Sequence, residues 1–311
     1  MLNVVSERKP LVKWTYNGGI WKSYSEPEAG RARIESGYYH GDSHPMMGPY
    51  FRKLNVVTDG LIVVPDSPAH KVMREIERFW MLEAEFKKRK LVYKRGILLW
   101  GAPGSGKTSM INSIVEMVKQ TDGVAVSFAD SDTLRAVKML RDSEPDRKLV
   151  VVMEDIDSFI NNGGEDMLLS MLDGNDQLHN VVYVATTNYP KLLPARFTNR
   201  PSRFDLIVEI GAPSAAFRRE FLSRKEPSLT AKELDAWVAK TDGFMTAHLR
   251  ELIILERCYK YPLDEAVARL RSMMSDTQFD GYAEEPKDPD DDDEEDDSNS
   301  VSSPAVEAVG G

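Results

Sequence analysis

The feature that most constrains this chain is the stretch Arg95–Ser109, which reads R-G-I-L-L-W-G-A-P-G-S-G-K-T-S. It begins with the apolar run Ile97–Trp100, which has the length and composition of a buried parallel strand. After the glycines, apolar residues recur at helical spacing between Ile111 and Val118. A strand, a glycine-rich loop and a helix in this order favour reading G-x-x-x-x-G-K-[ST] as a phosphate-binding loop, rather than as a chance glycine turn before a helix.

The chemistry of such a loop follows from its backbone. Glycines allow successive N–H groups to turn inward around an anion, and the N-terminus of the following helix adds partial positive charge. We expect Lys107 to reach the β- and γ-phosphates and the Thr108 hydroxyl to bind Mg²⁺. The residues predicted to bind a nucleoside triphosphate are Gly101, Ala102, Pro103, Gly104, Ser105, Gly106, Lys107, Thr108 and Ser109.

A second run of residues supplies what hydrolysis of a bound triphosphate needs. Leu149–Met153 is uniformly apolar, and Glu154 and Asp155 follow it directly. In open α/β sheets, ligands bind at the carboxyl edge, where acids in this position lie. One carboxylate there can hold a metal ion and the other can orient a water molecule. Packing gives no reason for two adjacent acids after a buried strand, so we expect them to belong to an active site.

Beyond the phosphate loop, predicted strands and helices alternate, which indicates a parallel sheet covered on both faces. The predicted strands are Val124–Phe128, Leu149–Met153, Val181–Ala185 and Leu206–Ile210, and the predicted helices between them are Asp132–Arg141 and Glu165–Leu172. From Ser214 onward the pattern is helical only, with a capping box at Thr230 and Glu233 and a cap at Thr246. The predicted fold class is therefore α/β: a P-loop core with a parallel sheet flanked by helices, followed by a small all-helical subdomain.

The part before the phosphate loop is less regular. Residues 1–50 are rich in Gly, Tyr, Trp, Ser and Pro and have weak periodicity, so we expect an irregular or short-stranded extension. Tyr50–Val56 and Leu61–Val64, joined by a turn at Thr58-Asp59-Gly60, are predicted to form a hairpin. A helix is expected to start at Ser67-Pro68 and to carry an apolar stripe as far as Phe86.

Charge and cysteine content limit the classes of protein. The chain has 311 residues and a formal net charge of −10, but residues 281–311 hold 12 acidic residues and one lysine. The remainder carries 39 basic and 38 acidic residues, so its charge does not indicate nucleic-acid binding. The single cysteine, Cys258, excludes a disulfide framework, and its apolar helical setting predicts a buried thiol. No apolar run approaches membrane-spanning length, so we expect a cytoplasmic protein that does not contact membranes.

Taken in order, the motifs between Leu61 and Met274 resemble those of the AAA family of ATPases. G-A-P-G-S-G-K-T resembles the Walker A motif of that family, and V-V-V-M-E-D-I-D occupies the place of Walker B. Four further segments resemble family motifs: L-L-S-M-L-D-G (Leu168–Gly174), V-A-T-T-N (Val184–Asn188), N-R-P-S-R-F-D (Asn199–Asp205) and G-F-M-T-A-H-L-R-E-L (Gly243–Leu252). The resemblance implies ATP and Mg²⁺ as cofactors and ATP hydrolysis as the reaction.

The resemblance also implies roles for individual residues. Asn188 takes the sensor position, and Arg200 and Arg203 take arginine-finger positions that reach the γ-phosphate of a neighbouring subunit in a ring, expected to be a hexamer. The usual Asp-Glu order of Walker B is reversed here, which resembles the branch that contains the mitochondrial Rieske-protein translocase. Glu154 then falls at the metal-side position and Asp155 at the water-polarising position.

Together these patterns predict four segments. They are an N-terminal extension at 1–60, an α/β ATPase core at 61–211, a helical lid at 212–280 and a disordered acidic tail at 281–311. The tail is predicted to be disordered because it holds too few apolar residues to form a core.

The favoured function is Mg²⁺-dependent ATP hydrolysis that drives the remodelling or chaperoning of a protein substrate. The loop Ala129-Asp130-Ser131-Asp132 lacks the aromatic–hydrophobic–glycine motif of peptide-threading rings, which counts against an unfoldase. One alternative is a nucleic-acid-associated loader or motor, although the neutral core and the lack of a basic–aromatic stripe count against it. Another alternative is a nucleotide-gated assembly scaffold that hydrolyses ATP slowly, which the unusual Walker B order allows.

Overall fold

The structure, a computed structural model, describes residues 13–24, 31–46, 48–56, 62, 65, 67–200 and 202–276. The acidic tail expected at 281–311 and the turn expected at Thr58-Asp59-Gly60 lie outside these residues. Among the helices of the described part, none has both the length and the hydrophobicity required to cross a lipid bilayer.

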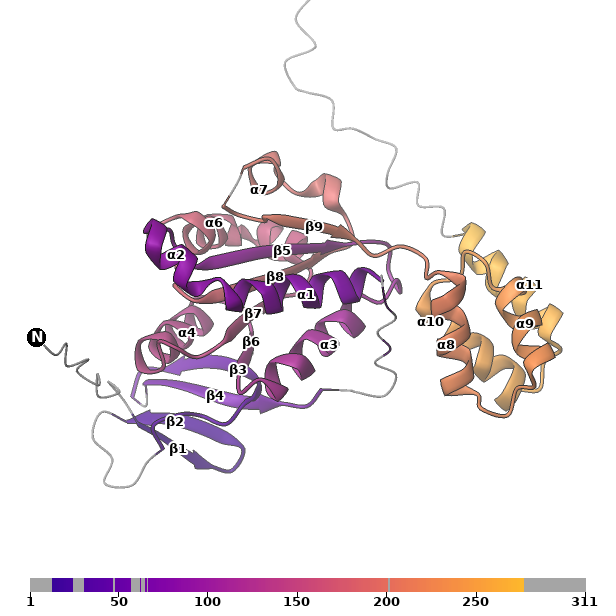
Figure 1. The fold of residues 1–311 in the computed structure, drawn as a ribbon, viewed down its shortest axis with the longest axis horizontal. Helices are drawn as coiled ribbons and strands as arrows, with labels where there is room; N and C mark the ends of the chain where they lie inside the picture. Colours follow the sequence, from indigo (N-terminus) through magenta and orange to yellow (C-terminus); the bar gives the residue numbers. More distant parts are fainter. Residues whose placement is uncertain are drawn as a thin grey trace, which may run out of the picture. The chain divides into compact units, whose positions relative to one another are not determined.

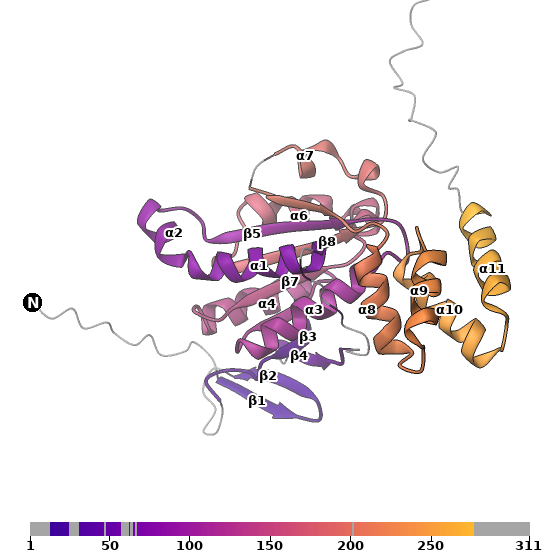
Figure 2. The same ribbon diagram turned by 45° about the vertical axis from the view of Figure 1, so that its right-hand side comes forward.

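The strands of the described residues form one nine-stranded sheet in the order β1-β2-β4-β3-β6-β7-β8-β5-β9 (Figures 1 and 2). From β3 to β9 in that order neighbouring strands are parallel, whereas β1, β2 and β4 are antiparallel to their neighbours. The strands are β1 (Lys13–Asn17), β2 (Ile20–Tyr24), β3 (Gly37–His44), β4 (Gly48–Leu54), β5 (Lys94–Trp100), β6 (Val124–Ser127), β7 (Leu149–Met153), β8 (Val181–Thr187) and β9 (Leu206–Glu209). The predicted α/β fold is confirmed, and each predicted core strand lies in the parallel part of the sheet.

Helices cover both faces of the parallel part (Figure 1). On one face are α1 (Pro68–Met81) and α3 (Lys107–Gln120), and on the other are α4 (Ser131–Ser143) and α6 (Glu165–Asp173). Shorter helical segments are α5 (Ile156–Phe159), η1 (Ile160–Gly164), η2 (Pro190–Leu192) and α7 (Ala195–Thr198). Because successive side chains of a strand point to opposite faces, Val150 of β7 packs with α1 and α3 while Val151 packs with α4 and α6. Burial on both faces explains why these strands read as continuous apolar runs.

Helix α1 begins where the sequence predicts. The Ser67 Oγ accepts a hydrogen bond from the His70 N–H at 3.2 Å, and a proline takes the first helical position. The stripe expected to continue to Phe86 is divided, because the backbone leaves helical geometry at Leu82 (φ −96°, ψ 6°). A separate helix, α2 (Glu83–Arg89), carries Phe86.

Beyond residue 212, the described residues, which end at Asp276, are helical, as predicted. Its helices are α8 (Ala215–Lys225), α9 (Ala231–Lys240), α10 (Thr246–Ile253), η3 (Ile254–Cys258) and α11 (Leu263–Asp276). Thr230 and Glu233 form the predicted capping box at the start of α9. Thr246 is the first residue of α10 rather than its cap, since the preceding Met245 holds the extended cap conformation.

Cys258 is exposed, so the predicted burial of its thiol is wrong. Leu252 and Leu255 are buried at helical spacing before it. The π-helical segment η3 has more residues per turn than an α-helix, and Cys258 at its end therefore does not continue the buried stripe.

The N-terminal region is more regular than its sequence predicts. Gly37–His44, within the segment expected to be irregular or short-stranded, is the eight-residue strand β3, which pairs with β6 on one side and β4 on the other. β4 pairs in turn with β2, so Tyr50 and Arg52 have partners on both sides. The hairpin expected between Tyr50–Val56 and Leu61–Val64 is therefore wrong for this strand, whose two edges are taken by β2 and β3. Trp14 and Trp21, both fully buried, provide the core of these strands.

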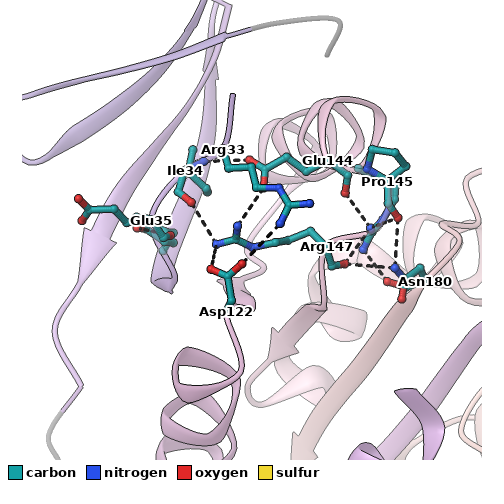
Figure 3. A network of polar contacts seen from close by, with 10 residues as sticks. Arg33, Ile34, Glu35, Asp122, Glu144, Pro145, Arg147 and Asn180 are labelled. Atoms are coloured by element: carbon teal, nitrogen blue, oxygen red, sulfur yellow. Dashed lines mark hydrogen bonds and ion pairs between the residues drawn. The ribbon is translucent and has the colours of Figure 1, made fainter. Parts of the chain in front are cut away.

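A buried polar network holds the segment before β3 against the sheet (Figure 3). The Ile34 N–H donates to Glu144 Oε1 at 2.9 Å, and Arg147 Nη2 donates to the Ile34 carbonyl oxygen at 3.0 Å. Arg147 also pairs with Glu144 Oε2 at 3.4 Å and with Asp122 Oδ1 at 3.3 Å. Side chains of the chain between α4 and β7 thus satisfy both backbone groups of Ile34, as a neighbouring strand would.

Candidate active site

The predicted phosphate loop joins the carboxyl end of β5 to the first turn of α3. Gly106 ends the loop at φ +112°, an angle that a side chain would disfavour, and Lys107 is the first residue of the helix. Beside the loop lies a cavity of about 340 Å³. Among the predicted residues, its lining includes Pro103, Gly104, Gly106, Lys107, Thr108, Ser109, Glu154, Asp155 and Asn188. Of the other predicted residues, Gly101 and Ala102 face the lysine amine, and Ser105 lines a neighbouring cavity.

Lys107 is held in the loop by three acceptors. Its Nζ donates to the Gly101 carbonyl oxygen at 2.6 Å, the Ala102 carbonyl oxygen at 3.1 Å and Asn188 Oδ1 at 2.6 Å. Burial lowers the pKa of this amine, while the nearby carboxylates of Asp155 and Asp157 oppose that change. A partly desolvated ammonium at a helix N-terminus interacts strongly with an anion, because little water screens the charge.

Thr108 and Glu154 are positioned to share a divalent cation. The Thr108 hydroxyl donates to Glu154 Oε2 at 3.2 Å, which joins the first turn of α3 to the end of β7. Burial raises the pKa of Glu154, the hydrogen bond from Thr108 lowers it, and the neighbouring Asp155 raises it further. A hydroxyl and a carboxylate oxygen at this separation fit Mg²⁺, which prefers a few protein oxygens together with phosphate and water.

Asp155 occupies the turn that follows β7. Its backbone lies in the left-handed region (φ 49°, ψ 54°), which is uncommon for residues other than glycine. Its Oδ1 accepts a hydrogen bond from Asn188 Nδ2 at 3.2 Å. Since the other amide atom of Asn188 accepts from Lys107, one side chain connects the lysine of the phosphate loop to this acid.

Two threonines at the end of β8 support the acids and were missed by the sequence analysis as functional residues. Thr186 Oγ1 accepts the Asp155 N–H at 3.0 Å, and the Thr187 hydroxyl donates to Asp157 Oδ1 at 2.5 Å. Both threonines are buried. The available signal was the change from apolar residues to two hydroxyl residues at the end of a buried strand, directly before Asn188.

A second cavity, of about 430 Å³, is lined in part by Ser105, Gly106 and Ser109 of the phosphate loop and was also missed. Its lining includes Ile62, Met110, Ile210 and Phe217, together with Ser105. A cavity lined by apolar side chains suits a flat aromatic group better than a phosphate. These residues come from distant parts of the sequence, so no local pattern could predict the cavity.

The residues that form this site lie in a region that matches a known protein family. A model of the family described as "ATPase family associated with various cellular activities (AAA)" matches residues 97–212, which run from β5 past β9. The matched region holds the phosphate loop, both acids, Asn188 and the two arginines. Residues 97–212 form an AAA domain.

Several curated relatives are 27–29% identical to this chain over the aligned residues. They include the ATP-dependent zinc metalloprotease FtsH 2 of Salinibacter ruber (27% identical; 60% of this chain, 30% of the relative) and the probable 26S proteasome regulatory subunit 10B of Caenorhabditis elegans (29%; 58% and 50%). A third is the probable mitochondrial chaperone BCS1-A of Dictyostelium discoideum (28%; 48% and 39%), from the branch to which the reversed acids pointed. The chain thus matches at most half the length of each of these relatives.

Within this AAA domain, the structure separates the two predicted finger arginines. Arg200 is largely exposed (65% for its side chain), and its Nε lies 3.4 Å from Asp173 Oδ2. Arg203 is buried: its Nε donates to Asp173 Oδ2 at 2.9 Å, and its guanidinium lies over the Phe197 ring and donates to the Arg196 carbonyl oxygen. Neither arginine lines the phosphate cavity. Arg200 fits a group that reaches outward, whereas Arg203 is buried and hydrogen-bonded inside its own chain, so its finger role stays a prediction.

The segment that resembles the AAA lid signature contacts the phosphate loop. The Ala247 N–H donates to the Gly104 carbonyl oxygen at 3.3 Å, and the Thr246 hydroxyl donates to the Ser105 carbonyl oxygen at 3.4 Å. Arg250, one turn further along α10, lines both cavities. Arg250 was not predicted as a site residue, although it lies one turn after Thr246, whose hydroxyl contacts the phosphate loop.

Proposed function

We propose that this protein hydrolyses ATP with Mg²⁺. The observation that carries the proposal is the chain of contacts from Lys107 through Asn188 to Asp155, beside the Thr108–Glu154 pair, on one cavity next to a phosphate loop. These groups cover the three requirements of phosphoryl transfer, namely charge on the phosphates, a metal ligand set and a group that orients water.

In this proposal the loop amides and Lys107 bind the phosphates, and the apolar cavity lined by Ile62 and Phe217 takes the adenine. Thr108 and Glu154 would hold Mg²⁺, which neutralises charge on the β- and γ-phosphates when bound. Asp155 accepts a proton from water as its oxygen attacks the γ-phosphorus. The bond from the γ-phosphorus to the bridging oxygen breaks, which releases ADP and inorganic phosphate.

We further propose that the chain assembles into a ring, expected to be a hexamer, in which Arg200 contacts the γ-phosphate bound by a neighbour. The exposure of Arg200 and its distance from its own cavity support this role, since an arginine delivered in trans makes hydrolysis depend on assembly. Work on a protein substrate is supported by the names of two relatives, a chaperone and a proteasome regulatory subunit.

The test compares wild-type protein with Asp155→Asn in the presence and absence of Mg²⁺. We expect phosphate release only from wild type with Mg²⁺, together with ATP binding by both proteins. The mass of each protein, measured by light scattering with and without ATP, reports assembly. A wild-type protein that assembles with ATP and shows negligible turnover would instead support the scaffold alternative, and stimulation of turnover by DNA would support the loader alternative.

A further inference from the structure

The loop that carries Arg200 is held by the amino end of β5. We call residues 199–205 the arginine loop; Pro201 lies outside the described residues. The Gly96 N–H donates to Asp205 Oδ2 at 3.0 Å, and the Asp205 N–H donates to the Gly96 carbonyl oxygen at 2.9 Å. Directly after this contact, β9 pairs with β5 in parallel, starting at Ile97 and Leu206 (Figure 1).

Gly96 allows this contact because it has no side chain. A Cβ at this position would lie 1.8 Å from the Arg203 carbonyl oxygen, which is a backbone atom and cannot rotate away. The position therefore requires glycine for close approach of two backbones. The arginine loop and the strand are in direct contact here, with no space for an intervening residue.

Lys94 makes the third contact between β5 and the arginine loop. It is only 8% exposed, and its Nζ donates to the Ser202 carbonyl oxygen. Burial lowers the pKa of the Lys94 amine, while Asp205 and Asp173 oppose that change. Burial of a charged amine costs free energy unless the amine is hydrogen-bonded. The hydrogen bond to Ser202 therefore stabilises Lys94 in its buried position. Ser202 has φ +75°, a left-handed conformation that is uncommon outside glycine and that the surrounding contacts must maintain.

We propose that Lys94 is a positioning residue, which fixes the arginine loop so that Arg200 points to the active site of a neighbouring copy. The inference rests on the proposed trans role of Arg200. β5 has seven residues and spans about 23 Å at about 3.3 Å per residue. The phosphate loop follows its carboxyl end, so a single strand joins a subunit's own phosphate site to the loop that serves the next subunit.

The role predicts a specific kinetic pattern for Lys94→Met. Loss of the donor frees the Ser202 carbonyl and lets the arginine loop move, and a displacement of about 1 Å at a catalytic group can lower a rate about a hundredfold. We expect kcat to fall about a hundredfold while the affinity for ATP stays within about twofold of wild type, because Lys107 and its loop are unchanged. Lys94→Arg keeps a cationic donor and should recover part of the rate. Lys88→Met, on the exposed surface of α2, is the matched control and should keep the parental rate.

Mixed assemblies test where Lys94 acts. Mixing Lys94→Met with Lys107→Ala should restore turnover, since some interfaces then combine an intact phosphate loop with an intact arginine loop. Mixing Lys94→Met with Arg200→Ala should not restore it, because neither partner supplies a working arginine. A purely structural role for Lys94 predicts no recovery in either mixture.

Three outcomes overturn the proposal. The first is a parental rate for Lys94→Met. The second is failure of Lys94→Met to recover with Lys107→Ala although Arg200→Ala does recover, which refutes positioning and leaves the proposed function intact. The third is failure of Arg200→Ala itself to recover with Lys107→Ala, which refutes the trans role and the positioning proposal with it. If Lys94→Met does not fold, Asp205→Ala replaces it, since it removes the acceptor of the Gly96 N–H at an exposed position and should recover in the same mixtures.

Discussion

The Nζ of Lys107 lies 2.6 Å from Oδ1 of Asn188, so the lysine of the phosphate loop and the amide at the end of β8 are directly hydrogen-bonded. The same amide donates to Asp155 through its nitrogen. Asn188 therefore holds a cation on one side and an anion on the other, which also fixes the orientation of its amide group. A γ-phosphate bound beside Lys107 would compete for this contact, and Asn188 is placed to transmit that change to Asp155.

Lys107→Ala should abolish tight ATP binding. A methyl group cannot replace a charge-assisted hydrogen bond to phosphate, and we expect the affinity to fall about tenfold to a hundredfold. Titration with a fluorescent ATP analogue measures this change, and circular dichroism should show an unchanged fold. Lys119→Ala, near the end of the same helix, is the control and should bind normally. Unchanged affinity in Lys107→Ala would contradict the phosphate-loop assignment.

Substitutions of the two adjacent acids, Glu154 and Asp155, should have different effects on the kinetics of ATP hydrolysis. Asp155→Asn keeps nearly the same shape but removes basicity, so ATP and Mg²⁺ should still bind while hydrolysis falls by about two to four orders of magnitude. Glu154→Gln should instead raise the Mg²⁺ concentration needed for half-maximal turnover, because it removes one charged metal ligand. Phosphate release measured across a Mg²⁺ titration distinguishes the two. The opposite pattern, with Asp155→Asn fully active and Glu154→Gln dead, would exchange the roles of the acids.

Arg200→Ala and Arg203→Ala should differ although the residues are three positions apart. Arg200→Ala should leave thermal stability near that of wild type and reduce turnover about a thousandfold, as expected for loss of an arginine finger. Arg203→Ala should destabilise the fold by about 3 kcal/mol, because it leaves the Asp173 carboxylate without its buried partner. Chemical denaturation and steady-state kinetics on both variants test this. Equal stability losses would show that Arg203 has no special structural role.

The different surroundings of Arg200 and Arg203 illustrate what could and could not be predicted from the sequence. The phosphate loop and the acids were predictable because each is a contiguous motif whose neighbours, an apolar strand and a helix, are local patterns. The resemblance to the AAA family placed Arg200 and Arg203 equally well at finger positions. It could not show that Asp173, thirty residues before Arg203, takes the donors of that arginine in the folded chain.

Strand β3 was not located from the sequence for a related reason. β3 reads G-Y-Y-H-G-D-S-H, which has neither strict alternation nor a continuous apolar run. It becomes a strand because β6 and β4, far away in the sequence, supply hydrogen-bonding edges on both sides. Strand propensity measures such tertiary context more than it measures the backbone preference of each residue, so a single sequence reveals it poorly.

The buried carboxyl group of Glu144 gives a prediction for pH. Burial raises its pKa, and the Ile34 N–H, Arg147 and Arg33 only partly oppose this, while Asp122 adds to it. Since the folded-state pKa lies above the unfolded-state value, the carboxylate destabilises the folded state at neutral pH. That penalty is relieved as the pH falls through the raised pKa toward the ordinary value of 4.5.

Glu144→Gln cannot titrate at this position, and its amide oxygen can still accept the Ile34 N–H. The difference in melting temperature, wild type minus Glu144→Gln, should therefore increase as the pH is lowered from about 7.5 to about 5. Taking the difference cancels the titration of groups common to both proteins, which makes the sign of the slope the decisive quantity. Glu35→Gln, an exposed carboxyl in the same segment, is the control and should show no such slope. A constant difference, or one that decreases in acid, would mean that Arg147 compensates fully for the burial of Glu144.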